Sequence, residues 1–140
     1  MHSLAFMPRR ASAFTLIELM IVVIIVAILA TIQLPMYHAN VVAARMSEGI
    51  SGVGTIRTAM RVYTASHGGN YPTFNHVDAS SLSAIGIMPT DLNGKFFQSG
   101  NYIVDSTATT YTIQATLLPS GETYIINQDG VESGTYQTGQ

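Results

Sequence analysis

One ionisable side chain, Glu18, lies inside an otherwise uncharged run that covers residues 14–34. A charge at the centre of a membrane-spanning helix costs roughly 2.5–3.5 kcal/mol on insertion scales, and less near the membrane surface. A helix that only anchors a protein gains nothing from carrying a carboxylate near its start. The position of Glu18 therefore indicates that a cationic partner neutralises it.

Other residues that could carry chemistry do not form a recognisable site. His38, His67 and His76 are far apart in the sequence and show neither His-x-x-x-His nor Glu-x-x-His spacing. No serine lies in a Gly-x-Ser-x-Gly motif, and no glycine-rich phosphate loop is present. The chain has no cysteine, which excludes disulfides, thiolate ligands and a cysteine nucleophile. We therefore predict that the protein is not an enzyme.

The segment Asp91-Leu92-Asn93-Gly94 is similar to part of a calcium-binding loop, and Asp129 is a further carboxylate. Calcium takes six or more oxygen ligands, and the closing Glu of such a loop is absent here. A turn containing glycine explains the segment better. We therefore expect no cofactor and no metal site, with calcium as the alternative.

The composition separates the chain from ordinary cytosolic domains. Its 140 residues allow one small domain and one membrane element, and they are 47% hydrophobic and only 10% charged. The net charge of −2 provides no basic surface for nucleic acid.

The N-terminal segment predicts a membrane helix. Residues 14–34 would form a helix about 31 Å long, which is enough to cross a bilayer. Arg9 and Arg10 precede it and place its start in the cytoplasm. A cleaved secretory signal fits less well, because the apolar run is too long and no small-x-small site follows it. A plain signal anchor leaves Glu18 unexplained.

The residues Ala13-Phe14-Thr15-Leu16-Ile17-Glu18 and the apolar run after them resemble the class III leader of type IV pilins and pseudopilins. Pro35 and Tyr37 also agree with common pilin sequences, and the resemblance extends to about Tyr63. It implies that a prepilin peptidase removes residues 1–13 by cutting between Ala13 and Phe14, and that it N-methylates Phe14. The family usually has Gly at the position of Ala13, which is also small.

The resemblance also implies how subunits assemble. Glu18 of one subunit would pair with the Phe14 amine of a neighbour, which sets the register of a homopolymer. An inner-membrane assembly platform would add subunits to the filament. Before assembly the subunit would be a single-pass inner-membrane protein with its head outside the cytoplasm.

The chain after residue 35 predicts a head domain over residues 36–140. Pro35 should kink the helix that covers residues 14–35. Beyond it, residues on one face recur every three or four positions and predict an amphipathic helix; they are Val42, Met46, Ile50, Val53, Ile56 or Arg57, Met60 and Tyr63. Gly49, Gly52 and Gly54 serve either close packing or a second flexible point.

The sequence predicts a long loop over residues 66–98, in which Ser80–Ile85 could form one or two helical turns. Three strands are predicted after it, at Asn101–Ser106, Thr109–Leu117 and Glu122–Gln128. The predicted fold is therefore α+β, with a long N-terminal helix on a three-stranded antiparallel sheet. This is also the pilin fold that the resemblance implies.

The leading functional hypothesis is a subunit of a type IV pilus-like filament for adhesion, motility or DNA uptake. The first alternative is a type II secretion pseudopilin, which would form a periplasmic pseudopilus. The passage from Tyr63 to Tyr71-Pro72 resembles the segment that follows the helix in pseudopilins. The second is a single-pass membrane protein with a ligand-binding head. The locations expected for the first two are an extracellular pilus and a periplasmic pseudopilus.

Overall fold

The computed structural model describes residues 14–136, apart from the side chains of residues 33–35. The chain divides into two compact units, of which the first ends at Ala39 and the second, the head, begins at Asn40. A single helix, α1 (Leu16–Ser66), contributes to both units. Arg9, Arg10 and Ala13 of the predicted leader lie outside the described residues. The predicted boundaries after residues 13 and 35 stay predictions.

The ends of α1 have clear local causes. Thr15 precedes the helix and exchanges hydrogen bonds with Glu18 in the first turn. After Ser66, Gly68 and Gly69 adopt φ angles of 66° and 89°, a region that glycine enters without strain. The Gly69 N–H donates to the Thr64 carbonyl at 3.0 Å, which satisfies one of the free carbonyls at the helix end.

The helical assignment continues through Pro35 without a break. A helix can pass through a proline while its axis bends there, because the proline removes one backbone hydrogen bond and crowds the preceding turn. The kink predicted at Pro35 therefore stays a prediction.

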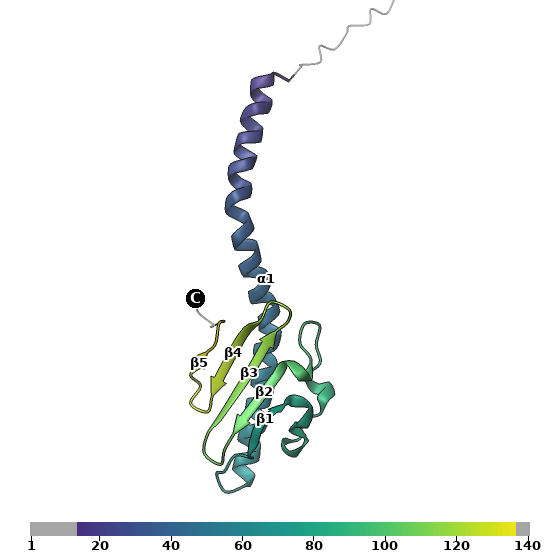
Figure 1. Ribbon diagram of the computed structural model, residues 1–140, viewed down its shortest axis with the longest axis vertical. Coiled ribbons are helices and arrows are strands. Elements are labelled where there is room, and N and C mark those ends of the chain that lie inside the picture. The colour runs from purple at the N-terminus through teal and green to yellow at the C-terminus, as the bar shows by residue number, and fades with distance from the viewer. Residues whose placement is uncertain (1–13, 137–140) are drawn as a thin grey trace, which may run out of the picture. The chain divides into compact units, whose positions relative to one another are not determined.

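The head contains a five-stranded antiparallel sheet in the order β1-β2-β3-β4-β5 (Figure 1). The three central strands are those that the sequence predicted: β2 (Tyr102–Ser106), β3 (Tyr111–Leu117) and β4 (Glu122–Asn127). The α+β class is confirmed, but the predicted number of three strands is wrong. Two edge strands were missed, namely β1 (Phe74–Asp78) and β5 (Glu132–Ser133).

The two missed strands lack the pattern that identified the others. In β1 only the first and fourth residues are half-buried, because a bulge lies between Phe74 and Val77. Strand β5 pairs only two residues with β4, which is too short for any alternation to be visible.

The core of the head lies between α1 and one face of the sheet (Figure 1). Burial alternates along strand β3, with its odd-numbered residues buried and Thr112, Gln114 and Thr116 on the outward face. From α1, four of the predicted apolar residues are buried: Met46, Val53, Ile56 and Met60. The predicted amphipathic helix over this part of the chain is therefore confirmed.

The predicted loop over residues 66–98 also contains two short 3₁₀ helices, η1 (Ala79–Ile85) and η2 (Pro89–Leu92), and a third, η3 (Ser99–Asn101), precedes β2. The helical turns expected at Ser80–Ile85 are confirmed by η1. Leu82, Ile87 and Phe97 are buried and fix the loop to the core, whereas Met88 is 66% exposed.

Candidate assembly site

Of the residues predicted to act in processing and assembly, Phe14 lies just before α1 and Glu18 lies in its first turn, whereas Ala13 is outside the described part of the chain. Phe14 is 73% exposed. The backbone N–H and the hydroxyl of Thr15 each donate to Oε2 of Glu18 at 2.9 Å. In return, the Glu18 N–H donates to Oγ1 of Thr15 at 3.3 Å. This reciprocal pair is a capping box, which satisfies two backbone donors of the first helical turn.

The capping box gives Glu18 a partner within its own chain. A carboxylate at the N-terminus of a helix also benefits from the partial positive charge of the helix dipole. A single chain can therefore hold the Glu18 carboxylate in hydrogen bonds of its own. The same bonds are short-range, so a neighbouring cation could replace them without unfolding α1.

The rest of this segment has no covering surface in a single chain. Every large apolar residue described between Phe14 and Ile32 is more than half exposed. Within residues 14–136, α1 is the one helix long and apolar enough to cross a membrane. Apolar side chains on all sides of a helix require either lipid or other helices around it.

The two carboxylates considered for calcium are each engaged in a local turn. Oδ2 of Asp91 accepts from the Met88 N–H at 2.8 Å at the start of η2. Oδ2 of Asp129 accepts from the Gln128 side chain at 2.9 Å, after β4. Across the described residues, no group of three or more His, Asp or Glu side chains is placed to hold a metal ion. Calcium binding stays an untested alternative.

Sequence reasoning missed the role of Glu48 in α1. Its Oε1 accepts from the backbone N–H groups of Phe96 and Phe97 at 2.9 and 2.8 Å. The carboxylate also lies directly against Gly94, where a side chain would collide with it. Glu48 thus joins the middle of α1 to the segment after η2. Nothing local in the sequence could pair it with residues almost fifty positions away.

The charge of Glu48 is maintained by this arrangement. Partial burial acts to raise the pKa of Glu48, but hydrogen bonds from the backbone of Phe96, Phe97 and Lys95, with the Lys95 charge, outweigh it. The pKa of Glu48 therefore lies below its ordinary value of 4.5.

Two of the three glycines in this part of α1 allow close packing. A Cβ on Gly49 would lie 2.5 Å from Cζ of Phe97, whose side chain is fully buried. A Cβ on Gly52 would collide with the hydroxyl of Tyr102, whereas one on Gly54 would meet nothing. The sequence left open whether these glycines serve close packing or a second flexible point. The structure favours close packing for Gly49 and Gly52.

Tyr102 is nearly completely buried below Gly52. Burial, with a contribution from the negative charge of Glu48, raises the pKa of Tyr102 to about 12. This hydroxyl therefore stays protonated over the whole physiological pH range.

A second polar contact joins α1 to the sheet. Nε of Arg57 donates to the Tyr111 hydroxyl on β3 at 3.2 Å. Close by, the Tyr124 hydroxyl on β4 donates to Oε1 of Glu132 on β5 at 3.1 Å. Burial, and then the contact with Glu132, raise the pKa of Tyr124 to about 12. The bond between Tyr124 and Glu132 thus connects the short β5 to β4.

Comparison with known proteins matches the N-terminal segment to one described motif. The profile of the prokaryotic N-terminal methylation motif matches residues 8–32, which include Ala13, Phe14 and Glu18. This range covers the predicted cleavage position and most of the predicted membrane helix. No solved structure matches the chain.

Three curated relatives extend the similarity beyond that motif. A fimbrial protein of Neisseria meningitidis is 41% identical over 93 residues, which are 66% of this chain and 51% of the relative. A fimbrial protein of Eikenella corrodens is 39% identical over 108 residues, or 77% and 63% of the two chains. A type IV major pilin protein of Neisseria gonorrhoeae is 34% identical over 115 residues, or 82% and 62%.

The matched regions thus cover between 51% and 63% of the length of these relatives. Because each matched region is far longer than residues 8–32, the similarity extends beyond the methylation motif. The predicted resemblance is therefore confirmed: over its matched region the chain is similar to fimbrial and type IV pilin proteins, and it carries the prokaryotic N-terminal methylation motif.

Proposed function

We propose that the protein is a structural subunit of a type IV pilus-like filament and polymerises through the N-terminal part of α1. The observation that carries the proposal is a single carboxylate, Glu18, at the start of an exposed helix that is apolar on all sides and lies within the matched methylation motif. The relatives named as fimbrial and pilin proteins support a pilus over a pseudopilus.

Processing would precede assembly. A prepilin peptidase would cut between Ala13 and Phe14 and methylate the new amine of Phe14. The precursor would lie in the inner membrane, with Arg9 and Arg10 on the cytoplasmic side and the head beyond the opposite surface. An assembly platform in that membrane would then pass the subunit to the growing filament, where related subunits surround its helix.

The chemistry of assembly would be an exchange of partners at Glu18. In the lone subunit its carboxylate accepts from Thr15. In the filament the positive Phe14 amine of a neighbour would take the place of these donors. Two charges buried among apolar helices are each costly, but a close pair compensates much of that cost. A helix shifted along the filament axis would leave both charges unpaired, so the pair favours one register.

No catalytic step and no cofactor is part of this proposal. The head would supply the outer surface of the filament, and its core of α1 against the sheet would give that surface a fixed shape. The bond-making steps belong to the peptidase and the platform.

The experiment that tests the proposal separates the charge of Glu18 from its capping role. Glu18→Gln retains a side chain that can complete a capping box but removes the charge. Thr15→Val removes the hydroxyl of the box and leaves the charge. We expect Glu18→Gln to enter the membrane normally but to form few filaments, and Thr15→Val to form filaments close to the wild-type amount. Electron microscopy and immunoblots of sheared-cell and membrane fractions measure both quantities.

Processing is monitored in both variants by N-terminal mass spectrometry, because both changes lie near the cleavage position. Abundant filaments from processed Glu18→Gln would show that the charge pair does not govern assembly. A processed Thr15→Val variant that fails to assemble while Glu18→Gln succeeds would assign the role to the capping box instead.

A further inference from the structure

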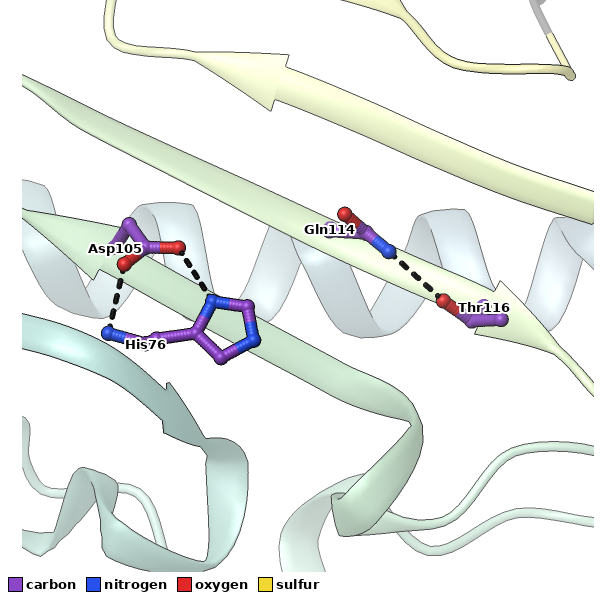
Figure 2. A network of polar contacts seen from close by, with 4 residues as sticks. All are labelled: His76, Asp105, Gln114 and Thr116. Atoms are coloured by element: carbon purple, nitrogen blue, oxygen red, sulfur yellow. Dashed lines mark hydrogen bonds and ion pairs between the residues drawn. The ribbon is translucent and has the colours of Figure 1, made fainter.

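The outward face of the sheet carries an irregular, strained segment next to a cleft. At the bulge in β1, Asn75 and His76 stand opposite Asp105 of β2. His76 has a φ of 51°, which is uncommon for a residue other than glycine. Its backbone N–H donates to Oδ1 of Asp105 at 2.7 Å, and its Nδ1 lies 3.1 Å from Oδ2 (Figure 2). Such bulges and strained positions occur preferentially beside functional sites.

The cleft beside this bulge has a volume of about 600 Å³. Its centre is a row of outward side chains, because Asp105 of β2 pairs with Thr112 of β3, and Thr112 pairs with Asn127 of β4. Asn75 of β1 extends the row at one end. The sheet itself therefore places a carboxylate, a hydroxyl and two amides along one line at the spacing of neighbouring strands, about 4.8 Å.

Much of the hydrogen-bonding capacity in this row is unused. Within residues 14–136, the side chains of Asn75 and Thr112 make no hydrogen bond. The Asn127 side chain accepts through Oδ1 from the N–H groups of Asp129 and Val131, which leaves its NH₂ group to donate. Each Asp105 oxygen accepts one bond and can accept another. The row therefore offers donors and acceptors side by side.

We propose that this cleft binds a neutral carbohydrate. A sugar hydroxyl both donates and accepts, so it matches a row that offers both, and the strand spacing is close to the width of a pyranose ring. Phe74 also lines the cleft, while its half-buried side chain packs against the core of the head. The site lies wholly in the head and does not depend on filament assembly.

The lining argues against other ligands. It includes no Lys or Arg, so an anionic group would find no counter-charge there. It includes one carboxylate, Asp105, which is already engaged by His76, so a divalent cation would have too few ligands. A peptide added as a strand would use the free main-chain edge of β1, whereas the row lies across the face of β2, β3 and β4.

The test uses the full chain in a detergent that contains no sugar headgroup. A glycan array with neutral, sialylated and sulfated oligosaccharides is probed first, and the strongest neutral ligand is then titrated by calorimetry. We expect binding of neutral oligosaccharides. Thr112→Val, which removes one hydroxyl and little volume, should weaken that binding about fivefold to tenfold, and Asn75→Ala should do the same.

Thr116→Val is the matched control, because Thr116 lies on the same strand and face but outside the cleft. Its affinity should equal that of the wild type, and circular dichroism establishes that all variants are folded. The proposal is overturned if no neutral oligosaccharide binds at millimolar concentration, if only charged glycans bind, or if Thr112→Val binds as tightly as the control.

Discussion

The roles of two glutamates differ in how well they can be predicted from the sequence. Glu18 stands out because it is the one charge in a long apolar run, and its bonds are to Thr15 in the same turn. Glu48 lies in an ordinary amphipathic stretch, and its bonds are to Phe96 and Phe97. The first residue could be singled out from local pattern alone. The second depends on the tertiary fold, which no local pattern contains.

Glu48→Gln should destabilise the head by about 1 kcal/mol at neutral pH, because a neutral acceptor replaces a charged one at two backbone donors. The pKa of Glu48 is lowered in the folded protein, so its contribution is complete above the ordinary value of 4.5. It is lost as the pH falls below 4.5 through the folded value. Denaturant unfolding of the full chain in detergent, at neutral and acidic pH, measures both effects.

Asp129→Asn is the control, because Asp129 lies on an exposed turn and accepts from a neighbouring side chain. It should retain wild-type stability at neutral pH. Acidification from neutral pH to a pH below 4.5 should lower the free energy of unfolding less in Glu48→Gln than in the wild type. An equal decrease in both would show that the assigned role of this carboxylate is wrong.

At the scale of elements, the regular parts of the fold could be predicted and the irregular parts could not. The alternation of β3 and the spacing of Met46, Val53 and Met60 in α1 are signatures of one buried face. β1 lacks such a signature because its bulge puts neighbouring residues out of phase. The cleft was not predictable either, since its row of side chains depends on the register between strands.

The glycines of α1 provide a prediction for this element. Gly52→Ala should destabilise the head by about 1 kcal/mol or more, because the added methyl group meets the buried Tyr102. Gly54→Ala should stabilise it by about 0.5–1 kcal/mol, because alanine favours the helix and meets no atom there. Chemical unfolding compares the two variants directly. Equal effects of the same sign would show that packing does not distinguish the two positions.

The kink predicted at Pro35 can be measured because the chain has no cysteine. Cysteines introduced at Ile28 and Ala44, both exposed, would carry spin labels on either side of Pro35. Pro35→Ala should lengthen the mean distance between the labels and narrow its distribution, because it restores one helical hydrogen bond. Pulsed electron resonance in detergent gives both values. An unchanged distribution would mean that Pro35 does not bend α1.

At the scale of the whole molecule, the two units differ in whether their apolar side chains are buried within the chain. The head buries its own core between α1 and the sheet. The described apolar residues before Ala39 are exposed and need a surrounding that a single chain does not provide. In the proposed function, lipid would surround these residues before assembly and neighbouring helices would surround them in a filament. The same segment can therefore serve both states without refolding.

The most direct test of the proposed function is mass spectrometry of the intact protein and its N-terminal peptide, isolated separately from sheared-cell and membrane fractions. The proposal predicts a chain that begins at N-methylated Phe14 and is present in the sheared fraction. Processed protein that stays in the cell envelope would indicate a pseudopilus instead. A chain that still begins at Met1 and occurs only in membranes would contradict assembly into a filament.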